Sequence, residues 1–358
     1  KVYVVHGQGT LYLTELNSDV KSVKGKPVKI WQGGFKNAHE LGGGFGMEGS
    51  HMYRINGKYY ITCPAGGTGG WQICLRSDNI YGPYEHKLIM NDWSSYPENG
   101  LHQGGMVQLK NGDWWFMIMQ DRGPIGRVPC LVPVKWIDGW PMLGDEGKDL
   151  ITYPKPATGK KSKIKSPATT DEFNASQLGL QWQWNHNPDN SRWSLKERKG
   201  YMRLYASQAS TLKDARNTLT QRVQGPSCEG SVEMEVTGLK DGNIAGFGIF
   251  EFPYAYVAIR QESGRRKIVM CNDGKDIETV EHFNGDKLWI RVRATDKEFK
   301  ALFYYSLDGV NYKRIGNELQ MGLGLPWTAN RFALFNFNTT PQGNNGYADF
   351  NWFRFTNK

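Results

Sequence analysis

The stretch GGGFGMEGSHMYRINGKYYI, residues 42–61, decides how the first half of the chain is interpreted. Two alternating runs, 51–55 and 58–61, flank Asn56-Gly57. Asn-Gly between two such runs is a strong signal for a β-hairpin with a two-residue turn. The glycines that precede the hairpin allow a loop whose backbone approaches its surroundings closely. The stretch therefore predicts a flexible loop that leads into a hairpin.

Glu48 is the single carboxylate of this stretch, and glycines stand on both sides of it. It is expected at or just before the first strand of the hairpin. A carboxylate presented in this way can act as a catalytic acid. The alternative is a surface glutamate near a turn, and the stretch taken alone favours that alternative.

The remainder of residues 1–150 repeats the same kind of pattern. Short runs of strand type are separated by turns, and residues 104–120 form a second hairpin pattern around Asn111-Gly112. Runs with helical period are hard to find. Regularly spaced, aromatic-rich hairpins suggest a sandwich, a barrel or a propeller. The spacing between hairpins fits propeller blades of roughly 40–50 residues.

The composition excludes several classes of protein. The chain has 358 residues, 13% aromatic residues and 43 glycines, which favours an all-β fold of two domains. It has no run of 18 apolar residues, so no membrane span is expected. Its five cysteines lack the CxxC spacing of a zinc site and do not form a disulfide framework.

The formal charge of +9 gathers partly in a lysine-rich run between residues 155 and 165. We interpret residues 153–169, which are also rich in proline and serine, as a solvated linker and not as a nucleic-acid patch. Neither nucleic acid nor a membrane is expected as a partner.

Residues 170–358 resume strand patterns that are longer and more regular. Alternation is clear over 288–293 and 349–355. Long antiparallel strands of this kind predict a two-sheet β-sandwich with a jelly-roll shape. Dinucleotide, P-loop, zinc-protease and serine-hydrolase motifs are missing from the sequence.

Several segments together resemble glycoside hydrolase family 43. In the first half they are EGSHMYRINGKYYI, GGTGGWQICLRSDNIYGPYE, HQGGMVQLKNGDWW and GRVPCLVPVKWIDGWP. The second half, with DEFNASQLGLQWQWNHNP, ARNTLTQR and YADFNWFRF, resembles the concanavalin-A-like sandwich of that family's β-xylosidases and arabinofuranosidases. We therefore predict propeller blades over 1–152, a linker over 153–169 and the sandwich over 170–358.

The resemblance implies a five-bladed β-propeller and an inverting mechanism with an acid, a base and an aspartate that tunes the acid. Glu48 falls on the acid position, with Ser50 where a proline is more usual. Arg127 falls on an arginine that contacts substrate. His102 lies near an axial histidine that can help to hold a calcium ion or a water molecule. Trp327 falls near an aromatic residue that the sandwich lends to the pocket.

Two further sets of residues are candidates for binding. Phe45, Trp71 and Trp327 could stack on sugar rings, although core packing is the safer interpretation for each of them. Asp349 and Glu172 could bind a structural calcium ion in the sandwich, because calcium prefers oxygen ligands.

Other aspartates near turns or strand ends are interpreted as turn-capping residues. They are Asp92, Asp113, Asp121 and Asp138.

The chain departs from the family pattern at its beginning. The base and the tuning aspartate would both precede Lys1, so about three blades are expected here and the expected base is lacking. We expect that either a second chain or segment supplies the N-terminal blades, or the sequence is a fragment of a longer polypeptide. Any signal peptide would also lie before Lys1, and a secreted or periplasmic location is expected before a cytoplasmic one.

These observations predict an exo-acting inverting glycosidase that releases arabinofuranose, xylose or both from xylan or arabinoxylan oligosaccharides. The chemistry requires no cofactor, while a structural calcium ion stays an option. The alternative is a carbohydrate-binding protein without catalysis, which the missing base would explain. A further alternative makes the sandwich only a brace for the propeller.

Overall fold

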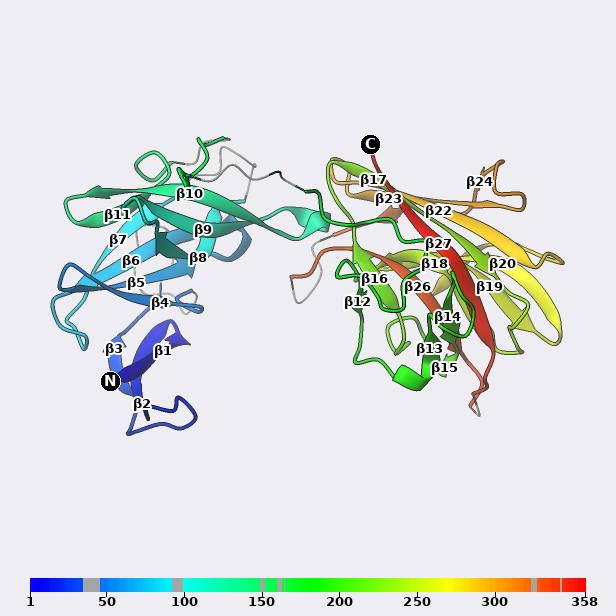
Figure 1. Ribbon diagram of the computed structural model, residues 1–358, viewed down its shortest axis with the longest axis horizontal. Helices are drawn as coiled ribbons and strands as arrows, with labels where there is room; N and C mark the ends of the chain where they lie inside the picture. Colours follow the sequence, from blue (N-terminus) through cyan, green and yellow to red (C-terminus); the bar gives the residue numbers. More distant parts are fainter. Residues whose placement is uncertain are drawn as a thin grey trace. The chain divides into compact units, whose positions relative to one another are not determined.

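The computed structural model divides the chain into two compact units (Figure 1). The first unit comprises residues 1–122 and 127–162, and the second comprises residues 123–126 and 163–358. In the part of the chain that is described, no helix is long and apolar enough to cross a membrane. The structure describes residues 1–34, 46–91, 99–148, 152–159, 163, 165–322, 327–341 and 343–358.

The described residues of the first unit form three antiparallel sheets that follow one another along the chain. The first sheet has β1 (Val2–Gln8), β2 (Thr10–Leu16) and β3 (Val28–Trp31). The second has β4 (His51–Ile55), β5 (Lys58–Ala65), β6 (Trp71–Ser77) and β7 (Glu85–Met90), with the short 3-10 helix η1 (Gly67–Gly69) before β6. The third has β8 (Leu101–Gln108), β9 (Trp114–Asp121), β10 (Arg127–Ile137) and β11 (Trp140–Leu143). Four-stranded sheets of this kind are the blades of β-propellers.

The hairpin predicted at Asn56-Gly57 is confirmed. Both residues have positive φ angles, 49° and 86°, as a type I′ turn requires. The second predicted hairpin also forms, between β8 and β9, but its loop is longer than two residues, because residues 109–113 lie between the strands.

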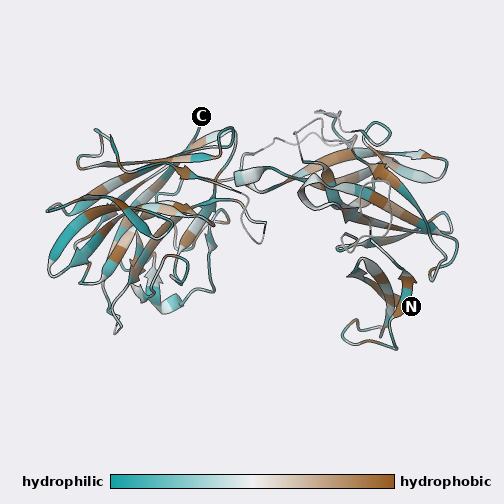
Figure 2. Cartoon of the chain, turned by 180° about the vertical axis from the view of Figure 1, so that it is seen from behind, coloured by the Kyte–Doolittle hydropathy of each residue, from teal (hydrophilic) through white to brown (hydrophobic). Residues whose placement is uncertain are grey.

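Apolar side chains hold the three sheets together in succession. Leu11 of the first sheet packs in one cluster with Ile61 and Ile73 of the second. Cys74 of the second sheet packs in another cluster with Phe116 of the third. Figure 2 shows hydrophobic residues within the strands of this unit, and β5 and β6 are buried along most of their length.

Where the structure describes it, the second unit is a sandwich of two sheets with eight strands each. One sheet contains β12 (Gln183–Trp184), β15 (Ser207–Gln208), β16 (Leu219–Arg222), β18 (Asn243–Phe250), β19 (Ala255–Glu262), β20 (Arg265–Asn272), β21 (Lys275–Val280) and β26 (Arg331–Asn338). The other contains β13 (Trp193–Ser194), β14 (Met202–Tyr205), β17 (Ser227–Glu235), β22 (Lys287–Thr295), β23 (Lys300–Ser306), β24 (Lys313–Arg314), β25 (Leu319–Gln320) and β27 (Tyr347–Asn357). Two 3-10 helices, η2 (Gly123–Ile125) and η3 (Asn190–Arg192), belong to the same unit.

The core of the sandwich lies between its two sheets. Leu288, Ile290 and Val292 of β22 are fully buried, and they pack in one cluster with Phe247 and Phe353. The alternation predicted over residues 288–293 is therefore confirmed. The predicted bounds of the propeller part, the linker and the sandwich stay a prediction, although residues 152–159 of the described chain contain no helix or strand.

Candidate active site

Glu48 lies in a turn that is anchored directly before and after it. The Met47 side chain is fully buried, and its backbone N–H donates to the carbonyl oxygen of Pro64 at 2.7 Å. The hydroxyl of Ser50 donates to the carbonyl oxygen of Met47 at 2.6 Å. The Glu48 side chain itself is exposed. These contacts hold the turn in place, and the turn exposes the Glu48 carboxylate to solvent.

Gly49 lets a neighbouring side chain lie directly against this turn. Its φ angle is +65°, and a Cβ atom placed on it would lie 2.9 Å from Nε2 of Gln103. An L-residue would meet both the strain of a left-handed backbone and this contact. The glycine therefore allows Gln103 to pack beside Glu48.

Gln103 reaches the turn because it is the extra residue of a β-bulge. The pairing of β8 with β9 shifts between His102 and Gly104, and Gln103 has a φ angle of +57°. The buried Gln72 side chain fixes the bulge, since its Oε1 accepts a hydrogen bond from the backbone N–H of Gln103 at 2.7 Å. Bulges commonly redirect side chains at functional sites.

Arg127, at the start of β10, is held by a buried carboxylate. Its Nε donates to Oδ1 of Asp121 at 3.2 Å, and its Nη1 lies 3.5 Å from Oε1 of Gln103. The Asp121 side chain is only 1% exposed, whereas a third of the Arg127 side chain is exposed. Gln103 therefore links the guanidinium group to the turn that carries Glu48.

His102 is buried beside the same aspartate. Its Nδ1 lies 3.1 Å from the carbonyl oxygen of Gly100, so we assign the proton of the neutral ring to Nδ1. Its Nε2 lies 3.7 Å from Oδ2 of Asp121. Burial lowers the pKa of His102, while the Gly100 hydrogen bond and the Asp121 charge act in the opposite direction.

Nε2 of His102 and Oδ2 of Asp121 could both accept a hydrogen bond from one donor group placed between them. Neutral His102 offers a lone pair at Nε2, and Oδ2 of Asp121 is buried without a hydrogen-bond partner in the described part of the chain. Two buried acceptors that face each other are satisfied by a group that donates to both. A water molecule fits this requirement, either alone or as the ligand of a cation.

Electrostatic effects connect Glu48 to these groups. Its negative charge raises the pKa of His102, against the effect of burial. It also adds to burial in raising the pKa of Cys63. Together with the contacts of Gln103 with the Gly49 turn and with Arg127, this effect groups Glu48, His102, Asp121 and Arg127 into one candidate site of the first unit. Such a site can donate a proton from Glu48 and bind hydroxyl groups through Arg127.

The three aromatic residues that were predicted to bind sugar differ from one another in their surroundings. Phe45 lies outside the described residues. Trp71 is 8% exposed and packs in the core cluster of the first and second sheets. Trp327 belongs to the second unit, is 41% exposed and has a φ angle of +64°. Their roles in sugar binding stay a prediction.

The predicted turn-capping role of Asp121 is wrong. Asp121 does stand at a strand end, but its carboxylate contacts Arg127 and faces His102 and does not cap a turn. An arginine six residues downstream, at the start of the next strand, was the only signal for this role.

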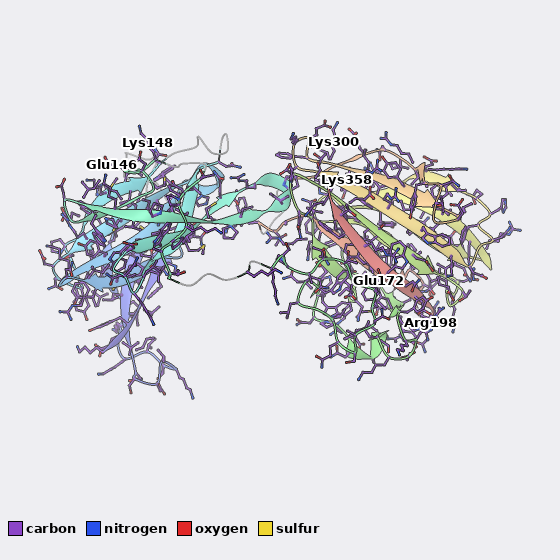
Figure 3. All side chains as sticks on the ribbon, turned by 45° about the horizontal axis from the view of Figure 1, so that its top comes forward. Glu146, Lys148, Glu172, Arg198, Lys300 and Lys358 are labelled. Atoms are coloured by element: carbon purple, nitrogen blue, oxygen red, sulfur yellow. The ribbon has the colours of Figure 1, made fainter. Side chains whose placement is uncertain are left out.

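The two candidate calcium ligands of the sandwich are bound by arginines. Asp349 accepts hydrogen bonds from Arg198 and, through both oxygens, from Arg203. Glu172 pairs with Arg354 at 2.9 Å (Figure 3 labels Glu172 and Arg198). Such pairing does not fit a calcium site. The described residues also contain no group of three or more side chains suited to a metal.

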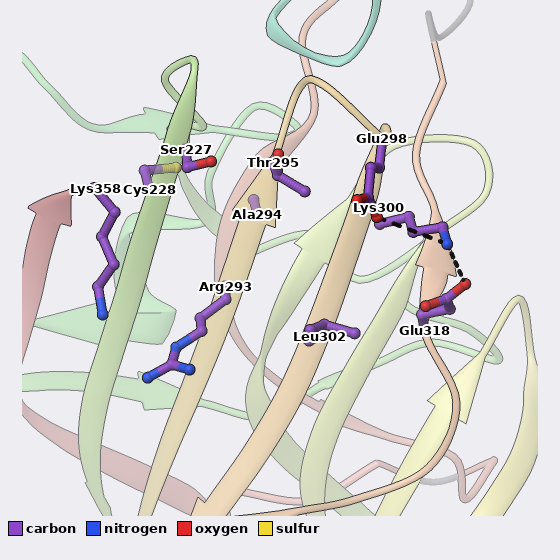
Figure 4. A pocket seen from close by; sticks show the side chains of 10 residues that line it. All are labelled: Ser227, Cys228, Arg293, Ala294, Thr295, Glu298, Lys300, Leu302, Glu318 and Lys358. Carbon is purple, nitrogen blue, oxygen red and sulfur yellow. Dashed lines mark ion pairs between the residues drawn. The ribbon is translucent and has the colours of Figure 1, made fainter.

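A pocket of about 280 Å³ lies on β17, β22 and β23 of the sandwich (Figure 4). Lys300 faces both of its carboxylates, at 3.8 Å from Glu298 and 2.9 Å from Glu318. Because each carboxylate faces this ammonium group, we assign the pocket no role in proton transfer.

Family models match both halves of the chain. Residues 1–141 match the model of glycosyl hydrolases family 43, and residues 170–356 match the β-xylosidase C-terminal concanavalin A-like domain. A solved bifunctional GH43-CE protein of Bacteroides eggerthii has a TM-score of 0.87 and 37% identity, over 99% of this chain and 46% of that one. This match agrees with the predicted propeller-type blades and sandwich.

Curated relatives agree with the family models. A β-xylosidase of Formosa agariphila is 32% identical over 87% of this chain and 60% of its own length. A non-reducing end α-L-arabinofuranosidase of Bacteroides ovatus is 28% identical over 87% of this chain and 63% of its own. The chain thus spans about six-tenths of the length of these relatives.

Proposed function

Since the chain belongs to glycoside hydrolase family 43, we propose that the complete protein is an exo-acting, inverting glycosidase. It releases xylose, arabinofuranose or both from xylan or arabinoxylan oligosaccharides. The names of the two relatives, a β-xylosidase and an arabinofuranosidase, support this substrate class. Because xylan is an extracellular polymer, we also propose that the enzyme is secreted or periplasmic.

The observation that carries the proposal is the presentation of Glu48 beside the group of Arg127, Asp121 and His102. Glu48 is the general acid that protonates the leaving oxygen. The buried neighbours of Glu48 keep its turn in place, so the carboxyl group needs little reorganisation to reach the glycosidic bond. Arg127 donates hydrogen bonds to sugar hydroxyls through its planar guanidinium group.

An inverting reaction also needs a second carboxylate, at roughly 6.5–9.5 Å from the acid, to activate water. Asp121 is unsuited to this role, because it is 1% exposed and its Oδ1 already accepts a hydrogen bond from Arg127. We therefore assign it to the positioning of Arg127.

Acid catalysis by Glu48 requires no metal. A cation held through water at His102 would orient that water and Asp121. Dialysis of the complete protein against EDTA tests this arrangement. A loss of activity that calcium restores would support a cation between His102 and Asp121, and full activity would support water alone.

The function is tested with p-nitrophenyl β-xyloside and p-nitrophenyl α-L-arabinofuranoside, using the complete protein and its Glu48→Gln variant. Loss of a general acid lowers kcat by about 10²- to 10⁴-fold. Glu85→Gln is the matched control, because Glu85 is an exposed glutamate of the same unit that pairs with Arg76. We expect this control to keep wild-type rates.

Three outcomes would count against the proposal. Undiminished rates in Glu48→Gln would exclude Glu48 as the acid. An equal loss in Glu85→Gln would point to a general effect of charge. Binding of xylo-oligosaccharide in calorimetry without release of sugar would favour a carbohydrate-binding protein.

A further inference from the structure

The turn between β9 and β10 belongs to the second unit although both strands belong to the first. Residues 123–126 group with the sandwich, whereas Arg122 and Arg127 on either side do not. The turn closes on itself through a hydrogen bond from the N–H of Gly126 to the carbonyl oxygen of Gly123 at 2.9 Å. Its geometry therefore decides where β10 begins.

Asn330 binds this turn from within the sandwich. Its backbone N–H donates to the carbonyl oxygen of Pro124 at 2.8 Å, and its Nδ2 lies 3.5 Å from the same oxygen. The amide also donates to the carbonyl oxygen of Gly322 at 2.7 Å, and the backbone oxygen of Asn330 accepts from Val223 at 3.0 Å. Asn330 is fully buried, so these bonds form away from bulk water.

Gly126 allows the turn to approach the sandwich without a gap. Its φ angle is +75°, and an added Cβ atom would lie 2.9 Å from the backbone nitrogen of Ala329. The same atom would lie 2.8 Å from Nη2 of Arg222, which donates to the carbonyl oxygen of Ile125 at 3.4 Å. Ile125 packs against the sandwich core. The turn is thus held by backbone, side-chain and apolar contacts.

Arg127 follows this turn directly. It forms the first pair of the β9–β10 ladder with Asp121, the residue that holds its guanidinium group. Asp121 fixes the side chain of Arg127, and the turn fixes its backbone. A displacement of the turn would move Arg127 relative to Asp121 and Gln103.

We propose that Asn330 is a positioning residue for Arg127, acting through Pro124 and Gly126. This inference rests on the proposed role of Arg127 in binding substrate. It gives the sandwich a task in the chemistry of the first unit that does not require any sandwich side chain to touch the sugar. A purely structural asparagine would stabilise the protein without altering substrate binding.

The first test is Asn330→Ala in the complete protein. The variant keeps the backbone bond to Pro124 and loses only the side-chain bonds to Pro124 and Gly322. Misplacement of a substrate-positioning group by about 1 Å can cost up to about 100-fold in rate, so for this smaller disturbance we expect kcat/KM to fall about three- to tenfold, mainly through KM. Asn336→Ala is the matched control. Asn336 is a buried asparagine of β26, the strand that begins directly after Asn330, and its Nδ2 donates to the carbonyl oxygens of Leu204 at 2.9 Å and Gly346 at 3.3 Å, away from the turn. A comparable loss in Asn336→Ala would overturn the inference.

A double-mutant cycle with Arg127→Ala separates positioning from general damage. If Asn330 acts through Arg127, Asn330→Ala has little further effect on kcat/KM once Arg127 is gone. Additive losses would overturn the inference. If Asn330→Ala does not fold, Arg222→Ala replaces it as the test, because Arg222 also contacts the turn but its side chain is exposed. It should show a smaller loss of the same kind, and additivity with Arg127→Ala would again contradict positioning.

Hydrogen exchange keeps this inference separable from the proposed function. We expect Asn330→Ala, but not Asn336→Ala, to accelerate amide exchange over residues 123–128. If the wild-type protein proves inactive, the proposed function fails, and exchange still shows whether Asn330 holds the turn. Unchanged exchange over 123–128 would overturn the inference even in an active enzyme.

Discussion

Asp121 and Arg127 lie opposite each other at the ends of β9 and β10, and Nε of Arg127 donates to the buried Oδ1 of Asp121 at 3.2 Å. This contact joins a carboxylate that is closed off from solvent to a guanidinium group that is one-third exposed. The exposed end can meet a ligand while the inner nitrogen stays fixed.

Asp121→Asn should weaken this contact without changing its shape. Hydrogen bonds to a charged group contribute about 1.5–3 kcal/mol, roughly twice as much as neutral ones. We expect kcat/KM to fall about tenfold and the unfolding free energy to fall by about 1–2 kcal/mol. Steady-state kinetics and urea denaturation measure the two effects. Asp113→Asn, in the exposed loop between β8 and β9, should change neither.

His102 should make stability depend on pH. Burial lowers its pKa in the folded protein, whereas an unfolded histidine titrates near about 6.5. As the pH falls below that value, the unfolded chain takes up the proton first, so the free energy of unfolding decreases until the folded pKa is reached. Urea denaturation at pH 7.5 and 5.5 measures this loss.

The control for this effect is His102→Gln, which removes the titrating group. Its stability should depend less on pH than that of the wild type. An equal dependence in both proteins would assign the effect to other groups. Asp121→Asn should lower the pKa of His102 further, because the Asp121 charge raises it, and an NMR titration would show this.

Gly49→Ala should reduce activity more than its cost in stability explains. A left-handed backbone costs an L-residue about 1–2 kcal/mol. The new methyl group would also push Gln103 away from the Glu48 turn. Gly57→Ala is the matched control, since Gly57 also has a positive φ angle but nothing lies within 4 Å of its Cβ position. Equal kinetics in the two variants would show that the Gln103 contact does not matter.

Asp349→Ala should destabilise the sandwich. Removing one partner of a buried ion pair costs about 3–5 kcal/mol when the remaining charge is left unpaired, and we expect a cost at the lower end of this range, because Arg198 keeps Glu235 at 2.9 Å and Arg203 keeps Glu197 at 3.3 Å. Here the loss would affect Arg198 and Arg203 together. Glu172→Gln breaks an exposed pair and should cost less than about 1 kcal/mol. Urea denaturation followed by tryptophan fluorescence compares the variants, and similar midpoints would contradict this ranking.

Local patterns in the sequence predicted most of the fold. Asn56-Gly57 defines its hairpin because both residues tolerate positive φ angles, and the alternation around Ile290 reports a strand with one buried face. The position of Glu48 next to the first strand of its hairpin was predicted by the same local signals. Its anchoring by Met47 was not, because the partner, Pro64, lies on another strand.

The rest of the site depends on contacts that no local pattern contains. In the sequence alone, Asp121 resembles a turn-capping residue. Only the folded chain brings the bulge at Gln103 and the ring of His102 close to it. Asn330, more than 200 residues from Pro124, gave no sign of the turn that it binds.

Residues 123–126 belong to the second unit, so the part of the chain that must be exchanged to replace the sandwich is discontinuous. A sandwich grafted from a relative at the linker would bring its own equivalents of Ala329 and Asn330 but would meet a foreign turn. In such a chimaera, the residue equivalent to Ala329 must leave room for Gly126, and the residue equivalent to Asn330 must still donate to Pro124. Chimaeras that transfer the turn together with the sandwich should therefore keep their activity, whereas chimaeras joined only at the linker should lose it.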